Sequence, residues 1–183
     1  MQPTSSSASW PIAELIPHRQ TMQLLTRILA LDEQSLWASA STKLSRSSCW
    51  GIEYLGQATA AFFTLSQRSR LTEEQASQLE PPQGMLIGSR RYQMHRSQLP
   101  ANAELLIQVS LQAPAAKALG ASGLVKFRGT LWELSQDALA ALPLSTATPR
   151  LPYDTHRLAA LEGQPLAEGD LSVYIPAQQP PSN

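Results

Sequence analysis

The spacing of apolar residues predicts one long helix in the first half of the chain. From Trp50 to Ser69, large apolar residues recur three or four positions apart, and small residues fill much of the remaining surface. A helix that is apolar on nearly all sides is normally covered on most of them. We therefore expect this helix to lie at the centre of the fold.

Segments with the alternation or β-branched content of strands lie on both sides of this helix. Two precede it, joined by a turn at Asp32–Glu33 that predicts an antiparallel hairpin, and four follow it. The six predicted strands are Met22–Leu31, Leu36–Leu44, Gly84–His95, Glu104–Leu111, Leu124–Leu134 and Leu171–Ile175. One apolar helix covered by one antiparallel sheet predicts an α+β fold in which the sheet curves around the helix, the hot-dog fold.

The ends of the chain and one internal segment differ from this predicted core. Residues 1–9 are polar and predict a disordered leader, and residues 177–183 predict a flexible tail. Residues 135–166 contain four prolines and predict an insertion before the last strand. We expect residues 10–176 to form a single domain that carries this insertion.

Composition narrows the classes of function. The 183 residues include 14 basic and 14 acidic side chains, a balance that argues against a general nucleic-acid binder. The only cysteine, Cys49, cannot form an intrachain disulfide, so a reducing compartment such as the cytoplasm is expected. No apolar run approaches membrane-spanning length, and we expect no membrane association.

Glu53 and Gln57 form the first candidate site, near the start of the predicted helix. They are four positions apart and therefore share a helix face. The apolar neighbours of Glu53 would favour the protonated carboxyl, which can donate a proton to a substrate, while the positive end of the helix favours the carboxylate. The simpler interpretation is a solvent-exposed acid that complements the helix dipole.

Two further residues could take part in chemistry at the same end of the helix. Gly51 would let a ligand approach free backbone N–H groups, which could polarise a carbonyl, although a plain capping glycine is the alternative. His18, in the turn Pro17–His18–Arg19, is of the residue type best suited to act as a general base. A lone loop histidine is more often an ordinary surface residue, and His95 and His156 compete for the role.

Arg90 and Arg91, with Arg96, Arg68 and Arg70, form a group of basic residues. Each alone is most simply a solvated charge. Together they could receive an acidic carrier protein or the phosphate of its phosphopantetheine arm.

No pair of histidines has metal-ligand spacing, and the chain has neither a glycine-rich phosphate loop nor a nucleophile-elbow serine. We therefore expect no metal and no cofactor.

Four segments resemble the 3-hydroxyacyl-[acyl-carrier-protein] dehydratases of the hot-dog fold. Ile12–Leu29 resembles their opening Leu-Pro-His-Arg turn followed by a strand. Gly51–Gln57 resembles their central-helix motif, in which Glu is followed four residues later by Gln. Residues 84–105 and Leu171–Pro176 resemble the following strand pair and the closing strand. The chain is most similar to the ApeP-like subgroup, which is linked to aryl-polyene and xanthomonadin-type pigment synthesis.

The resemblance implies dehydration of 3-hydroxyacyl thioesters on acyl carrier protein to trans-2-enoyl thioesters, in fatty-acid-like or aryl-polyene pigment synthesis. It implies Glu53 as the acid, with Gly51 polarising the thioester carbonyl and Gln57, Arg90 and Arg91 binding substrate. The implied partners are a carrier protein with a phosphopantetheine-linked acyl chain and a second copy of the chain, joined sheet edge to sheet edge. No cofactor is implied.

One departure from the family pattern leaves alternatives open. The standard dehydratases carry their catalytic histidine in a His-Phe-Pro-Gly loop before the helix, and this chain has no histidine between Arg19 and Met94. If His18 takes that role, we expect it to approach Glu53 across the dimer interface, beside a narrow apolar tunnel. Otherwise the chain is a catalytically silent subunit that pairs with an active dehydratase. A hot-dog thioesterase, in which the helix-borne Glu activates water, is the third alternative.

Overall fold

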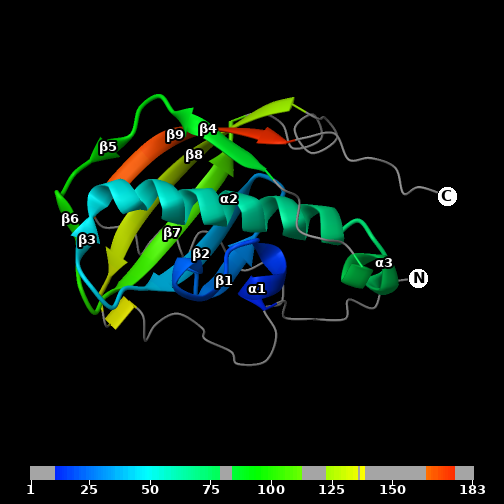
Figure 1. The fold of residues 1–183 in the computed structure, drawn as a ribbon, viewed down its shortest axis with the longest axis horizontal. Helices are drawn as coiled ribbons and strands as arrows, with labels where there is room; N and C mark the ends of the chain where they lie inside the picture. The colour runs from blue at the N-terminus through cyan, green and yellow to red at the C-terminus, as the bar shows by residue number, and fades with distance from the viewer. Residues whose placement is uncertain (1–10, 79–83, 113–122, 136, 139–163, 176–183) are drawn as a thin grey trace.

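The computed structural model describes residues 11–78, 84–112, 123–135, 137–138 and 164–175 (Figure 1). Their elements, in chain order, are α1 Ile12–Leu15, the 3-10 helix η1 Gln20–Met22, β1 Arg27–Leu31, β2 Ser35–Ser41, β3 Arg46–Ser47, the 3-10 helix η2 Ser48–Trp50, α2 Gly51–Arg68, α3 Glu73–Gln78, β4 Met85–Ser89, β5 Gln93–Met94, β6 Gln98–Leu99, β7 Glu104–Leu111, β8 Gly123–Leu134 and β9 Ala167–Ile175. Of the segments predicted to be irregular, the leader 1–9, the tail 177–183 and most of the insertion 135–166 lie outside the described residues.

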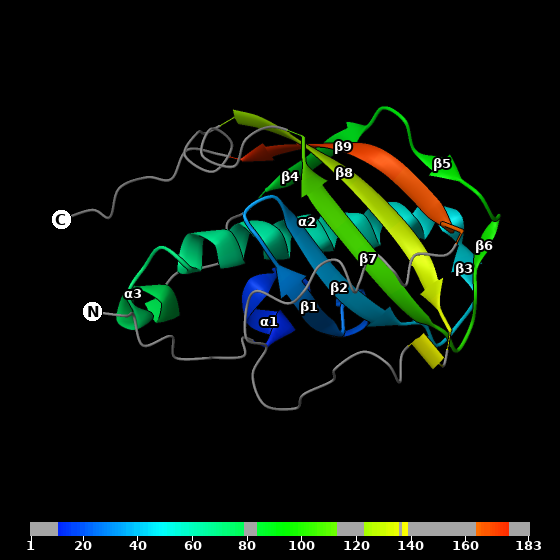
Figure 2. The same ribbon diagram turned by 180° about the vertical axis from the view of Figure 1, so that it is seen from behind.

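The described strands form a seven-stranded antiparallel sheet that curves around α2. Its strand order is β1-β2-β7-β8-β9-β4, with β5 also paired to β9, and β3 and β6 form a separate two-stranded ladder. Figures 1 and 2 show the long helix α2 lying along one face of this sheet, with α1 beside it. The predicted hot-dog fold is confirmed. In the described part of the chain, no helix is long and apolar enough to cross a membrane.

The core lies between α2 and the concave face of the sheet. Leu55, Ala58 and Phe62 of α2 are fully buried there, because inward-facing residues of alternating strand positions meet them from β2, β7 and β8. Gly129 lies in β8 directly under the helix, where a Cβ atom would come within 2.7 Å of the Leu55 side chain. The missing side chain at Gly129 therefore lets α2 approach the sheet closely.

A second apolar cluster lies on the opposite face of the sheet. Trp37 of β2 and Trp132 of β8 stack there across β7, with ring centroids 5.8 Å apart and an interplanar angle of 17°. Both indoles are buried, at 2% and 5% exposed. The sheet is therefore apolar on both faces in this region.

Several strand boundaries differ from the sequence prediction. The predicted strand Leu36–Leu44 ends at Ser41, and the predicted strand Gly84–His95 is divided into β4 Met85–Ser89 and β5 Gln93–Met94. The first predicted strand, Met22–Leu31, pairs only from Arg27, because the backbone around Met22 and Leu24 bonds to the Gln57 side chain instead of to a neighbouring strand. The last strand begins at Ala167, earlier than Leu171, since residues from Ala167 onward pair with β8.

Candidate active site

His18 and Glu53 meet at the mouth of the helix–sheet interface. The His18 Nε2 atom lies 3.1 Å from the Glu53 Oε1 atom, and the side chains are 32% and 34% exposed. Both residues belong to the same chain, so the expected approach across a dimer interface is wrong. The reason is local: the turn that carries His18 follows α1, and α1 packs on α2. The burial expected for Glu53 is only partial.

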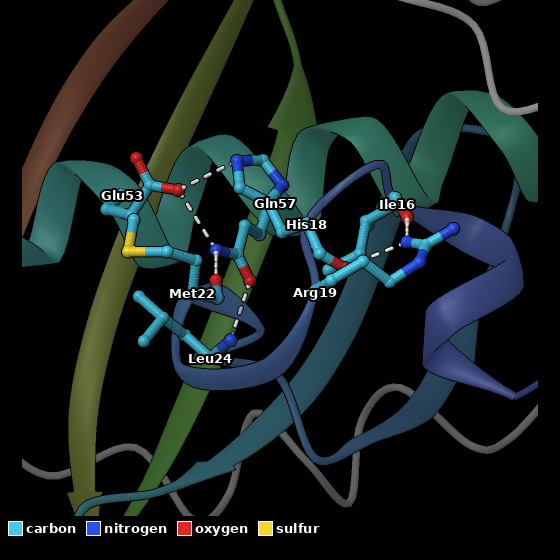
Figure 3. A network of polar contacts seen from close by, with 7 residues as sticks. All are labelled: Ile16, His18, Arg19, Met22, Leu24, Glu53 and Gln57. Carbon is cyan, nitrogen blue, oxygen red and sulfur yellow. Dashed lines mark hydrogen bonds and ion pairs between the residues drawn. The ribbon is translucent and has the colours of Figure 1, made fainter.

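Gln57 fixes this pair to the backbone at the end of η1 and just beyond it (Figure 3). Its Nε2 donates to Glu53 Oε1 at 2.9 Å and to the Met22 carbonyl oxygen at 2.6 Å, while its Oε1 accepts from the Leu24 N–H at 2.9 Å. The side chain is fully buried. Every one of these bonds is internal, so Gln57 positions Glu53. Its binding of substrate stays a prediction.

The two oxygens of the Glu53 carboxylate differ in their contacts. Both His18 and Gln57 contact Oε1. Among the described residues, no polar group contacts Oε2. That oxygen is therefore the one available to an incoming ligand.

The turn that holds His18 is fastened by Arg19. The Arg19 Nη1 donates to the Ile16 carbonyl oxygen at 2.6 Å and to the His18 carbonyl oxygen at 2.8 Å (Figure 3). Ile16 is fully buried, so the turn is tied to the core. His18 is consequently held at Glu53 by its neighbours on both sides, Pro17 and Arg19.

An apolar cavity of about 130 Å³ opens beside the pair. His18 and Glu53 are its polar lining residues at one end, and the rest of its wall is mostly apolar. The remaining lining residues are Pro17, Gly56, Thr59, Ala60, Phe63, Gly84, Leu86, Val173 and Ile175. The structure thus places the acid and the histidine at an apolar pocket, as the sequence analysis expects for a base at His18. It adds walls from β4 and β9, segments that the sequence indicated as strands but not as part of the site.

Gly51 does not present a free donor. Its N–H donates to the carbonyl oxygens of Ser48 and Cys49, and the Tyr92 hydroxyl, which also donates to the Ser48 oxygen, lies where a Gly51 Cβ would be. Burial raises the pKa of Tyr92 to about 12, with Cys49 nearby adding to the rise, so the phenol remains a donor. The glycine is needed for the close packing of Tyr92, and its proposed role toward a carbonyl is not retained.

This packing gives a testable prediction. We expect Gly51→Ala to lower the free energy of unfolding by about 1–3 kcal/mol, the usual cost of forcing a methyl group into a packed site. In a Tyr92→Phe background the same change should cost much less, because the hydroxyl that it meets is gone. Urea unfolding of the four proteins of this double-mutant cycle measures the difference. Equal costs in both backgrounds would show that Gly51 is not constrained by Tyr92.

The other sequence candidates lie away from the cavity. Arg90 and Arg91 are exposed in the turn between β4 and β5, and neither lines the cavity. His95 instead contacts Glu168, at 3.2 Å. This hydrogen bond, together with the nearby Arg128, holds the pKa of the Glu168 carboxyl below its usual value. His156 lies outside the described residues. Within the described ranges, no group of three or more His, Cys, Asp or Glu side chains is placed to hold a metal ion.

The strand order and the enclosed helix are those of hot-dog proteins, and comparison with solved structures agrees. The dehydratase heterocomplex ApeI:P from Xenorhabdus doucetiae aligns with a TM-score of 0.65 at 15% identity, covering 92% of this chain and 93% of that chain. A hypothetical thioesterase with coenzyme A from Streptococcus pneumoniae TIGR4 aligns at 0.49 and 6% identity, over 84% of this chain and 88% of that one. The likeness to the Xenorhabdus doucetiae complex concerns the fold alone. No curated protein matches the chain.

The sequence itself defines the class more closely. Residues 10–160 match the model of the ApeP-like family, described as ApeP dehydratase. The chain is therefore a dehydratase-type hot-dog protein. It belongs to the ApeP-like family, and the matched range includes most of the predicted insertion 135–166.

Proposed function

We propose that the chain dehydrates 3-hydroxyacyl thioesters carried on acyl carrier protein to trans-2-enoyl thioesters. The observation that carries this proposal is the 3.1 Å contact between His18 and Glu53 at the mouth of an apolar cavity. Dehydration needs a base for the α-proton and an acid for the leaving hydroxyl, placed at the same end of an acyl-binding pocket. The membership in a dehydratase family supports the same reaction.

In the proposed reaction, His18 removes the proton from Cα and Glu53 protonates the leaving 3-hydroxyl group. The electron pair of the Cα–H bond forms the Cα–Cβ double bond, and the C–O bond at Cβ breaks to release water. Neither step needs a cofactor. The apolar wall of the cavity accepts the acyl chain beyond Cβ.

The direct contact between the two residues also provides a way to restore their protonation states after turnover. After one turnover His18 carries the proton taken from the substrate, and Glu53 has lost its own. Transfer of one proton from His18 Nε2 to Glu53 Oε1, across 3.1 Å, returns the histidine to its neutral form and the carboxylate to its acid form.

The experiment that tests the proposal is incubation of the full chain with 3-hydroxyacyl carrier-protein substrates, followed by mass spectrometry. Loss of one water from the carrier-bound acyl group supports dehydration. Free acid with no enoyl product would favour a thioesterase, in which Glu53 activates water. No turnover alone, with activity only beside a second hot-dog chain, would favour the silent-subunit alternative.

Arg90 and Arg91 are proposed to receive the carrier protein. They are exposed and stand outside the cavity, so they can contact only the part of a substrate that remains outside it. Arginines suit the acidic surface or phosphate of a loaded carrier. Cys49, exposed and free, supports a reducing compartment such as the cytoplasm for the reaction.

We also propose that β4 is the edge by which two copies of the chain join. It is the last strand in the sheet order, and its Met85 and Ile87 are 58% and 60% exposed. An unpaired, apolar edge strand favours pairing with another chain. Gly84 and Leu86 at this edge line the cavity, so a partner there would lie next to the bound acyl group.

We expect the wild-type chain to have a dimer mass in solution and Ile87→Lys to shift it toward the monomer, because a buried lysine would oppose the contact. Light scattering during size-exclusion chromatography measures both masses. Leu44→Lys is the matched control, since Leu44 is 69% exposed but lies in the turn after β2. A dimer that survives Ile87→Lys and dissociates with Leu44→Lys would place the interface elsewhere. A wild-type monomer would leave a different hot-dog chain as the partner for this edge.

A further inference from the structure

The short helix α1 is fastened to α2 at a point about three turns beyond Glu53. The Thr64 hydroxyl of α2 lies 2.8 Å from the carbonyl oxygen of Leu15, the last residue of α1, and the Thr64 side chain is fully buried. The Ala60 carbonyl oxygen lies 3.0 Å from the same hydroxyl, but in an α-helix it already accepts the backbone N–H of Thr64. The single hydroxyl hydrogen therefore serves the Leu15 oxygen.

This bond is the main polar link between the two helices. In the described part of the chain, no other polar group bonds to the Leu15 oxygen. One turn further along α2, Arg68 contacts Glu14 of α1 at 3.7 Å, but the Glu14 side chain is 48% exposed. An ion pair that is open to solvent on one side contributes little. The place of α1 against α2 therefore depends on the Thr64 hydroxyl.

Only two residues separate this link from the histidine. Ile16 follows Leu15 with a fully buried side chain, and its carbonyl oxygen accepts a hydrogen bond from Arg19 Nη1 at 2.6 Å (Figure 3). Pro17, whose ring fixes its φ angle, comes next and leads into His18. Little backbone freedom is left between the Leu15 oxygen and the imidazole, so a shift at one is passed to the other.

The imidazole of His18 is itself held by one polar contact. Its Nε2 faces Glu53 at 3.1 Å, while its Nδ1 is buried and has no hydrogen-bond partner among the described residues. No polar group on that side of the ring helps to fix its orientation. The placement of the ring therefore follows from the backbone of the turn that carries it.

We propose that Thr64 is a positioning residue for His18. Its hydroxyl holds the Leu15 carbonyl group, and this bond sets where the following turn presents the imidazole to Glu53. The effect of Thr64 on turnover rests on the proposed function, whereas its effect on the place of His18 does not. Thr64 is not among the residues that line the cavity, so it acts on the reaction only through His18.

Thr64→Val keeps the shape of the side chain and removes the hydroxyl. The unpaired Leu15 oxygen would turn toward water and carry the His18 turn with it. Since misplacement of a reacting group by about 1 Å can cost up to about a hundredfold in rate, we expect kcat to fall by about tenfold or more, with KM unchanged. Thr64→Ser, which keeps the hydroxyl and loses the methyl group, should retain nearly the wild-type kcat. Should Thr64→Val fail to fold, Thr64→Cys, with a weaker donor of similar size, should show a smaller fall in kcat.

The place of His18 can be measured without turnover by its reaction with diethyl pyrocarbonate, which modifies the nitrogens of accessible neutral imidazoles. Mass spectrometry of peptides gives the rate at each histidine. In the wild type both nitrogens of His18 are shielded, one by Glu53 and the other by burial. Thr64→Val should raise the rate at His18 by roughly twofold to tenfold, the factor by which loss of one hydrogen bond shifts an opening equilibrium, with no change at His95.

Thr42→Val is the matched control. Thr42 is also buried, and its hydroxyl also bonds to a backbone carbonyl oxygen of a distant segment, that of Pro100, at 2.7 Å. It directly follows β2 and does not line the cavity. The Thr42→Val protein should lose stability, while its kcat and the reactivity of its His18 stay as in the wild type.

The outcomes distinguish this inference from the proposed function. A rate at His18 that rises only when the Thr64 hydroxyl is lost, in a protein that dehydrates nothing, would uphold the positioning role and remove the proposed reaction. Turnover with both kcat and His18 reactivity unchanged in Thr64→Val would overturn the positioning role and leave the reaction standing. Equal falls of kcat in Thr64→Ser and Thr64→Val, or in Thr42→Val, would show that kcat follows stability and would also overturn that role.

Discussion

His18→Ala is expected to lower the turnover of a 3-hydroxyacyl substrate by about a hundredfold or more, the usual loss when a general base is removed. Glu53→Gln should cause a loss of the same order, because the amide cannot protonate the leaving hydroxyl. Since the two residues act on one substrate through one contact, the double variant should lose little more than either single one. Rates of water loss, measured by mass spectrometry at saturating substrate, test these three expectations.

The chain offers a matched control in its second histidine–glutamate pair. His95 contacts Glu168 at 3.2 Å and has nearly the same exposure as His18, at 30% against 32%, but it does not line the cavity. His95→Ala should therefore keep its turnover. If His18→Ala retains full activity, or His95→Ala loses it, the base is not His18.

Gln57→Leu is expected to reduce both stability and activity. The substitution removes the partners of the Leu24 N–H and the Met22 carbonyl, which lie against a fully buried side chain. Each polar group left unpaired in the interior costs about 1–3 kcal/mol. Turnover should also fall, because Glu53 loses the hydrogen bond that orients its carboxylate.

Urea unfolding gives the stability change as a lower midpoint at unchanged slope. Thr59→Val is the control for stability: Thr59 is also buried in α2, but among the described residues its hydroxyl bonds only to the Leu55 carbonyl one turn earlier. Loss of the Thr59 hydroxyl should therefore leave no other buried polar group without its hydrogen-bond partner. A Gln57→Leu protein as stable as the wild type would show that the segment around Met22 and Leu24 finds other partners.

The sequence predicted the structure best where the apolar residues of a segment follow one regular spacing. The predicted helix Trp50–Ser69 agrees with α2 to one residue at each end, and Glu104–Leu111 has the same bounds as β7. Burial of one face follows directly from spacing in both cases. The start of β1 could not be predicted this way, because the competing hydrogen bonds come from Gln57, more than thirty positions later in the chain.

The sequence predicted which residues form the site better than it predicted how those residues are arranged. Glu53 and Gln57 share a face by spacing alone, but only the packing of α1 on α2 brings His18 to them within one chain. Gly51 presents no free donor for the same kind of reason: its N–H is bonded within the turn, and Tyr92, from the segment between β4 and β5, packs against it. Contacts between segments that are far apart in the sequence produce no regular spacing of residues from which they could be predicted.

The stacked indoles of Trp37 and Trp132 have a practical consequence for optical work on this protein. Two aromatic chromophores at 5.8 Å in a fixed orientation couple electronically, and such a pair gives a bisignate circular dichroism band. The pair lies on the sheet face opposite α2, in a different cluster from the residues around the cavity. It is therefore an intrinsic, label-free reporter of sheet integrity that a ligand beside His18 and Glu53 leaves undisturbed.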